Sequence, residues 1–552
     1  MRPRLLILRR LPARPSNTYR AFAQSTSTRS GLRTRPQLPF LSVPSASRPV
    51  RFLTTERRAR LKFEIKQGIK YTAYIWVAVG CVAAASVAVH FELLEREYPT
   101  PHEWSIFTRI CFRGGHCARD QTDPNRPTDW PAIFTWIERV VERLEDPTID
   151  GKDLRDAPSD RPPGTKDLSA KSEEWRRGYF ETLMLYAKAA EHLDGWVRDT
   201  TRNMVFPPGI AVGTSNPWPR PLPPGFHGAR PKEEDCEPAY ESADNIYLKL
   251  ISTEGLTTRQ RMEASLAYAS WLEFRGDTGP AGIMYEDSLN IALAEQTSLP
   301  TEPVDRKTWT LNDAAGLPSA NVLTALTAFA TFKARTGDMS LAFPVLVSLL
   351  RARKSLPAPD SPLAPARPLP AKPAPSGVEN KIVRFFTPPA YPPPPPDGKA
   401  PPVRDAKEIC EEAALSLYIG EIMYSSQDSS REEGLGWTRE AVDIAEEQLH
   451  RLGTSKADRP ARLTCRECLI TGLGNWSDMV ARLAKEEAAK KEAAASQPKK
   501  ASWFGLWGDG KEEDLSRWAA EERVIEERKR RVKDLADELE PPGSGLASLF
   551  TA

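Results

Sequence analysis

The stretch Tyr71–Phe91, YTAYIWVAVGCVAAASVAVHF, determines how the rest of the chain is organised. It contains no charged residue and no proline, and at a rise of about 1.5 Å per residue it can cross the roughly 30 Å hydrocarbon core of a bilayer. The buried helix of a soluble core rarely needs so long an apolar run. The sequence therefore predicts one transmembrane helix over residues 71–91. Its Ala and Val content suits a simple anchor.

The charges on either side give this segment a direction. The basic residues before it are Arg57, Arg58, Arg60, Lys62, Lys66 and Lys70, and the acidic residues after it are Glu92, Glu95 and Glu97. Basic flanks stay on the side from which a span is inserted. We therefore expect the short N-terminal arm inside and the long remainder outside. A single span also excludes a channel or transporter built from this chain alone.

The first 55 residues have the composition of a mitochondrial presequence, with eleven arginines, many Ser and Thr, no lysine and no acidic residue. The segment Arg51, Phe52, Leu53 and Thr54 resembles a presequence cleavage site. A secretory signal is disfavoured because arginines interrupt its short apolar core, and a disordered basic tail remains the alternative. A presequence followed closely by a moderately apolar span predicts arrest in the mitochondrial inner membrane. The N-terminus would then lie in the matrix and residues 92–552 in the intermembrane space.

Charge is divided unevenly along the 552 residues. Residues 1–70 carry 17 Arg and Lys against two Glu, a net charge of +15, whereas the other 482 residues carry −13. An acidic soluble region disfavours nucleic acid as a partner, because phosphate binding needs a cationic face. Seven cysteines are too few for a disulfide framework, although one or two bridges in an oxidising compartment remain open.

Beyond the span the apolar periodicity is helical, which predicts an all-α fold. An apolar turn ending at Cys117 and a proline-rich excursion over 207–231 interrupt the pattern. The expected helices cover 129–145, 171–204 (as one helix or two), 245–251, 259–274, 281–293, 321–335, 341–350, 406–424, 432–452, 462–483 and 514–539.

Two of the helix pairs share a spacing. Aligned on a glycine at the turn, both place Ala seven residues before it, Ala five residues after it and a large apolar residue four further on. These positions are Ala269, Gly276, Ala281 and Tyr285 in one pair, and Ala330, Gly337, Ala342 and Leu346 in the other. Small residues where antiparallel helices cross, with glycine at the turn, are typical of tetratricopeptide repeats. An unrelated helical bundle is the alternative.

Stacked hairpins of this kind form a concave groove from their first helices, which can bind extended or helical peptides. Ser270, Glu273 and Thr331 are the positions that we expect to face this groove.

Residues 355–404 contain seventeen prolines, typical of a polyproline-type segment without a core. We interpret it as a surface insertion in the helical array, with a ligand for an SH3-like domain as the alternative. Trp503–Trp507 is an aromatic cluster that would anchor a partner, contact a membrane surface or fold back. The predicted divisions are 1–55 presequence, 56–70 basic matrix segment, 71–91 span, 92–354 first helical part, 355–404 insertion, 405–484 second helical part and 485–552 charged helical tail.

The sequence contains no phosphate-binding glycine loop, nucleophile elbow, HExxH or dinucleotide fingerprint. Cys111, His116 and Cys117 have no second ligand pair at zinc spacing. We interpret Cys465 and Cys468 as packing thiols or a structural disulfide rather than a redox pair, and leave a bridge between Cys111 and Cys117 open. The sequence thus predicts a protein that is not an enzyme, with no catalytic residue, cofactor, metal or small-molecule substrate.

At YPTPHEW, AKSEEWRRGYF, TTRQRMEASLAYASWLEFRGD and CRECLITGLGNW, the chain resembles the fungal tetratricopeptide-bearing adaptor subunit of the mitochondrial inner-membrane i-AAA protease. The resemblance spans most of residues 92–480, and the long proline insertion departs from it. It implies that the array recruits unfolded or misassembled membrane proteins to the protease. A non-proteolytic scaffold or assembly factor for an inner-membrane complex is the alternative. An import receptor on the outer membrane is disfavoured by the leader.

Overall fold

The computed structural model describes residues 55–120, 127–158, 161–162, 164–222, 228–295, 301–359, 391–425, 431–453, 458–496 and 513–539. Residues 1–54 of the predicted presequence, with the cleavage region Arg51–Thr54, lie outside them. So do most of the proline insertion and the cluster Trp503–Trp507. The chain divides into two compact units, Met1–Ser86 and Val87–Ala552.

The apolar span lies within one long helix, α1 (Thr55–Glu97), which also takes in the basic segment before it. At about 1.5 Å per residue, 43 residues extend about 65 Å, roughly twice the thickness of a hydrocarbon core. Its apolar side chains are exposed, among them Trp76 at 70% and Val82 at 69%. Among the described helices, α1 is the one long and apolar enough to cross a membrane.

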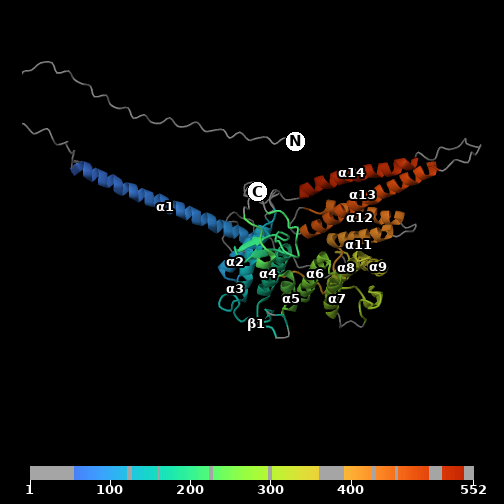
Figure 1. Ribbon diagram of the computed structural model, residues 1–552, viewed down its shortest axis with the longest axis horizontal. Coiled ribbons are helices and arrows are strands. Elements are labelled where there is room, and N and C mark those ends of the chain that lie inside the picture. Colours follow the sequence, from blue (N-terminus) through green and yellow to red (C-terminus); the bar gives the residue numbers. More distant parts are fainter. Residues whose placement is uncertain are drawn as a thin grey trace, which may run out of the picture. The chain divides into compact units, whose positions relative to one another are not determined.

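The second unit is built mainly from helices (Figure 1). They are α2 (Ile106–Asp120), α3 (Trp130–Glu145), α4 (Glu173–His192), α5 (Ala243–Ser252), α6 (Thr258–Arg275), α7 (Thr278–Ala294), α8 (Ala320–Arg335), α9 (Met339–Lys354), α11 (Ala406–Ser425), α12 (Arg431–Arg451), α13 (Arg459–Ser496) and α14 (Glu513–Leu539). The prediction of a mostly helical fold is confirmed.

Each of these helices packs against the next one in the chain. In addition, α4 contacts α6, α6 contacts α8 and α11 contacts α13, so alternate helices also touch. One apolar core runs from α2 to α11, and a second lies among α11, α12, α13 and α14. The four helices of the second core lie side by side in Figure 1.

Small residues allow the close helix crossings. The residues at the crossings are fully buried: Ala269, Ala281, Ala330 and Ala342. Gly276 ends α6 and Gly337 follows the end of α8, with positive φ angles of 90° and 92°. A Cβ added to Gly420 would lie 2.8 Å from the Gly434 carbonyl oxygen, so α11 and α12 need glycine at both positions. The large residues Tyr285 and Leu346 fill the space beside the crossings, with exposures of 4% and 0%.

Two sequence predictions in the first half were wrong. The apolar turn ending at Cys117 is instead helix α2, in which a Cβ at Gly115 would approach Ile137 Cδ1 to 2.5 Å. The two glycines of that helix therefore serve a close crossing with α3 rather than a turn.

The helix predicted over 171–204 ends at His192. Gly195 follows with a φ of 74°, and Asp199 accepts hydrogen bonds from the backbone N–H and hydroxyl of Thr201, at 2.9 and 2.5 Å. Short polar side chains that bond the backbone two residues on favour turns over helix. Small antiparallel sheets form here and nearby: β1 (Arg155–Asp156) with β2 (Lys166–Asp167), and β3 (Val197–Asp199) between β4 (Met204–Phe206) and β5 (Cys236–Pro238).

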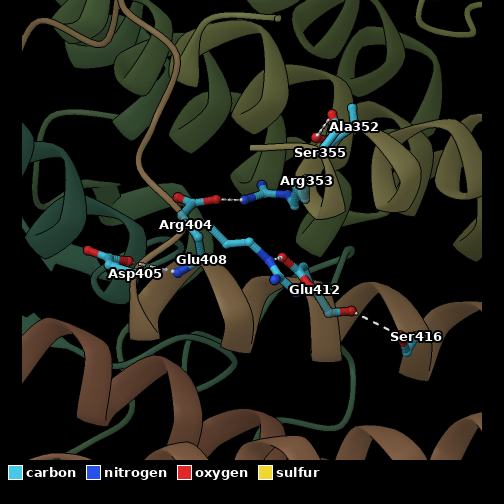
Figure 2. A network of polar contacts seen from close by, with 8 residues as sticks. All are labelled: Ala352, Arg353, Ser355, Arg404, Asp405, Glu408, Glu412 and Ser416. Atoms are coloured by element: carbon cyan, nitrogen blue, oxygen red, sulfur yellow. Dashed lines mark hydrogen bonds and ion pairs between the residues drawn. The ribbon is translucent and has the colours of Figure 1, made fainter. Parts of the chain in front are cut away.

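The proline-rich insertion leaves and re-enters the array at one place. The backbone N–H of Arg404 donates to the carbonyl of Pro357 at 2.9 Å. Arg353 forms an ion pair with Glu408, and Arg404 forms a two-pronged pair with Glu412 at 2.7 and 2.8 Å (Figure 2). Because its ends are held together, α11 packs on α9 although a long segment separates them in the sequence.

One disulfide joins the second half. It links Cys410 on α11 to Cys465 on α13, with 5.1 Å between their Cα atoms. Cys468 is a buried thiol, and neither Cys111 nor Cys117 takes part in a disulfide. Of the bridges left open from the sequence, neither the Cys465–Cys468 nor the Cys111–Cys117 pair forms. The separation of 55 residues between the bonded cysteines is why CxxC spacing did not reveal the pair.

The charged tail helix is part of the second core. On α14 the apolar residues Ile525 and Val532 are buried, with exposures of 1% and 5%. Arg528 also reaches Asp443 of α12 at 2.5 Å. The charged side chains of α14 therefore form ion pairs with neighbouring helices as well as with one another.

Candidate functional site

A groove with a cavity of about 720 Å³ lies between α2, α4, α5 and α6. Most of its wall comes from α4 and α6, which also contact each other. Its lining is His116, Arg119, Phe180, Glu181, Met184, Leu185, Lys188, Glu191, His192, Tyr247, Ala267, Ser270, Trp271 and Phe274. Pockets of this size, mostly apolar with a few polar groups, are common ligand sites.

The floor of the groove is apolar and well packed. Phe180, Leu185 and Trp271 are exposed by only 5–7%, whereas Phe274 on the rim is 82% exposed. Trp271 and Phe274 stack with their ring centroids 5.9 Å apart. A rigid aromatic floor with an exposed aromatic rim offers apolar contact area to a bound chain at little cost in conformational entropy.

The charged residues that line the groove are two basic and two acidic, and each has an ion-pair partner, two of them within the groove. Glu191 accepts a hydrogen bond from the Tyr247 hydroxyl at 2.6 Å and an ion pair from Lys188 at 2.7 Å. The ring of His192 stacks on Trp130, with 3.8 Å between centroids. The groove therefore presents little unbalanced charge to a ligand.

Two buried polar atoms in the wall have no hydrogen-bond partner among the described residues: Trp271 Nε1 and His116 Nε2. Buried polar groups are nearly always hydrogen-bonded. Burial, helped by the nearby positive charge of Arg119 and opposed by Asp120, lowers the pKa of His116 to about 4. The imidazole is thus neutral near pH 7, and both atoms keep hydrogen-bonding capacity that the described residues leave unused.

A second cavity of about 320 Å³ adjoins the first and shares His116 and Glu181 with it. The rest of its lining is Glu97 at the end of α1, Tyr98 and Pro99 directly after it, Phe112 of α2, Arg177 of α4, and the extended segment that begins at Tyr391. We call Tyr391–Ala400 the strap.

The strap is held at both ends. Arg177 of α4 lies over the Tyr391 ring, 4.2 Å from its centroid, and donates to the Pro392 carbonyl at 2.6 Å. At the other end the backbone N–H groups of Ala320 and Asn321 donate to the carbonyls of Ala400 and Gly398, both at 3.1 Å. The first turn of α8 thus gains acceptors for N–H groups that a helix leaves unpaired.

Of the predicted groove residues, Ser270 lines the 720 Å³ cavity. Glu273 lies further along α6, where it pairs with Arg335 of α8 at 2.6 Å and accepts from the Tyr285 hydroxyl at 2.9 Å. Thr331 is 6% exposed and donates to the Ala328 carbonyl at 3.0 Å, so it does not face an open surface. The structure therefore brings Ser270 to the groove and not the other two.

Sequence reasoning missed the wall made by α2 and α4. A signal was present on α4, where Phe180 and Met184 form a second apolar stripe beside the one that holds Trp175, Tyr179 and Leu183. A helix with two apolar stripes packs on one side and offers the other to a ligand or neighbour. Wherever the chain is described, no three His, Cys, Asp or Glu side chains gather as a metal site.

The comparisons add no relative. The chain matches no protein-family model, no curated protein and no solved structure.

Proposed function

We propose that this protein is an inner-membrane adaptor of mitochondria that captures extended segments of unfolded or misassembled membrane proteins and delivers them to the i-AAA protease. The observation that carries the proposal is the neutral, aromatic-floored groove on a helical array that follows a helix long and apolar enough to cross a membrane. A peptide in such a groove is bound by apolar area and by the unpartnered atoms of Trp271 and His116. The protease as partner rests on the family resemblance.

The helix packing is compatible with a degenerate tetratricopeptide array, as the proposal requires. Consecutive helices pack in pairs, and alternate helices touch on one side. In such an array the first helices of the pairs form the concave surface. The groove lies mainly on α2, α4 and α6, which hold this position if α2–α3, α4–α5 and α6–α7 are the pairs, and Tyr247 of α5 adds to its wall.

The disulfide supports the proposed topology. Disulfides persist in oxidising compartments and are rare where glutathione and thioredoxin keep thiols reduced. A bridge between Cys410 and Cys465 therefore favours the intermembrane space over the matrix for the region after the span. This agrees with the side that the basic flank of the span predicts.

Groove variants test the capture of substrates. Phe274→Glu places a charge on the exposed rim, and Ile283→Glu makes the same change on α7, where Ile283 is 63% exposed and is not part of the groove. We expect Phe274→Glu to reduce co-purification of unfolded membrane proteins at least tenfold and Ile283→Glu to leave it unchanged. Equal capture by both variants would remove the groove from the proposal.

Proximity labelling from the C-terminus tests the partner. If the protein is an adaptor, the labelling enzyme at its C-terminus should label an AAA+ protease of the inner membrane. If it is a scaffold, only the complex that it assembles should be labelled. Protease added to mitoplasts should degrade the region after the span. Protection of that region would contradict the orientation.

A further inference from the structure

The strap lies in the 320 Å³ cleft in the manner of a bound peptide. Polyproline segments dock in clefts lined by aromatic side chains, since their extended helix is preformed and loses little entropy on binding. Here the cleft presents Tyr98, Phe112 and His116, and Pro392, Pro393 and Pro395 of the strap line it. A polyproline helix repeats every three residues, so Pro392 and Pro395 share a face.

The strap is held on one side only. All five prolines from Pro392 to Pro396 remain exposed. Prolines have no backbone N–H to donate, and among the described residues one hydrogen bond, from Arg177 to the Pro392 carbonyl, ties this run to α4. A cavity also remains between the strap and the helices, whereas protein interiors are close-packed. The fit is that of an exchangeable ligand rather than of a core element.

The Tyr391 end carries the specific contacts. The Arg177 side chain is 9% exposed, stacks on the Tyr391 ring and reaches both the tyrosine hydroxyl, at 3.3 Å, and the next carbonyl, at 2.6 Å. Burial and the charge of nearby Glu181 raise the pKa of Tyr391 to about 12, so the phenol stays neutral. The cleft therefore recognises an aromatic residue followed by proline.

From these contacts we propose that the cleft between α2 and α4 is a binding site for extended segments with an aromatic residue followed by prolines, and that Tyr391–Pro395 occupies it as an intramolecular ligand that an incoming segment displaces. The displaced and resident segments compete for Arg177. Because His116 and Glu181 belong to both cavities, release of the strap joins the cleft to the 720 Å³ groove. Binding to the cleft stands by itself, but its use in substrate selection rests on the proposed function.

The tether sets the strength of this competition. The strap is anchored at Asp397, whose carbonyl accepts from Asn321 Nδ2 at 2.9 Å, only six residues after Tyr391. Short tethers give effective concentrations on the order of millimolar. The resident segment therefore weakens binding of a free peptide with a similar sequence by about tenfold when the intrinsic dissociation constant is about 0.1 mM.

Fluorescence anisotropy with a labelled peptide, PAYPPPPP (residues 389–396), tests the proposal on the full-length protein in detergent. Tyr391→Ala weakens the resident ligand and leaves the cleft intact, so the labelled peptide should bind about tenfold more tightly than to the unaltered protein. Arg177→Ala removes the side chain that contacts the tyrosine, and when it is added to the Tyr391→Ala protein, in which the resident segment no longer competes, it should lower affinity at least tenfold. Pro394→Ala, at the one position of residues 391–395 outside the cleft lining, is the matched control and should change affinity less than twofold.

A second probe avoids any effect of a variant on folding. The peptide PAAPPPPP, which lacks only the tyrosine, should bind the Tyr391→Ala protein at least tenfold more weakly than PAYPPPPP. Equal binding of the two probes, or unchanged affinity in Tyr391→Ala, overturns the proposal. The Phe274→Glu capture assay is scored separately: tyrosine-dependent peptide binding without substrate capture keeps this inference and removes the proposed function.

Discussion

The two halves of the soluble region use the same helical packing and are stabilised in different ways. From α2 to α9 the helices share one apolar core, which continues to α11 and contains Trp175, Tyr179 and Phe329, and no disulfide joins the described residues of these helices. From α11 to α14 the core is smaller, and a disulfide and ion pairs between helices, such as Arg439 with Glu521, add to it. Ion pairs between helices occur in both halves, as Arg335 with Glu273 shows in the first, so the comparison shows that the half without the groove adds a covalent link to a smaller core.

The junction between the halves should show the largest effect. Arg353 is 4% exposed and paired with Glu408, whose side chain is 13% exposed, so Arg353→Met leaves a largely buried carboxylate without its partner. We expect the free energy of unfolding to fall by about 3–5 kcal/mol, measured by denaturant unfolding. Adding Glu408→Leu should restore most of the loss, because an apolar pair of similar volume replaces a buried ion pair well. Failure of this rescue would show that the pair does more than balance charge.

The disulfide should distinguish the halves most clearly. Its loop of 55 residues predicts a stabilisation of about 4 kcal/mol. Cys410→Ala with Cys465→Ala should therefore lower the hydrogen-exchange protection of α11, α12 and α13 and leave that of α4 and α6 unchanged. Cys468→Ala is the matched control, since it removes a buried thiol that is outside the bridge. Equal loss of protection in both halves would mean that they unfold as one unit.

Acid should act on the half with the groove. The folded-state pKa of His116 is about 4, below the unfolded value of about 6.5. Between these values the unfolded chain binds the extra proton, so the stabilisation is complete above pH about 6.5 and is lost as the pH falls towards about 4. We expect a loss of about 3 kcal/mol over this range. His116→Gln should flatten the pH dependence of unfolding, and His102→Gln, at an exposed position, should not.

The smallest effect is expected at the α6–α8 contact. Glu273 pairs with Arg335, and its pKa is lowered chiefly by that hydrogen bond. Its stabilisation is present above the ordinary carboxyl pKa and is lost as the pH falls below it. Because Arg335 is 46% exposed, Glu273→Gln should lower the free energy of unfolding by no more than about 1 kcal/mol. A thermal unfolding series with Glu263→Gln, which removes a pair within one helix, checks whether the interhelical pair matters more.

Helix periodicity predicted most of the fold, and the reasons for its failures are local. The expected helices at 259–274 and 321–335 agree with α6 and α8 to within a residue at either end, because apolar spacing and a Thr or Ser cap act within the segment. The expected helix at 171–204 was too long. Helix-forming Ala and Leu continue up to His192, and the Asp and Thr residues that follow form turns instead. The site was harder to predict. Ser270, one of the three expected groove residues, lines the 720 Å³ cavity. His116, Arg177 and Tyr391 are far apart in the sequence and come together only through packing of the helices and the strap.

The meeting of Pro357 and Arg404 has a practical consequence. A foreign folded module whose own termini lie close together can be spliced between these residues, upstream of Tyr391, without pulling α9 away from α11. A fluorescent protein placed there would report the abundance and whereabouts of the chain while leaving both of its ends untagged.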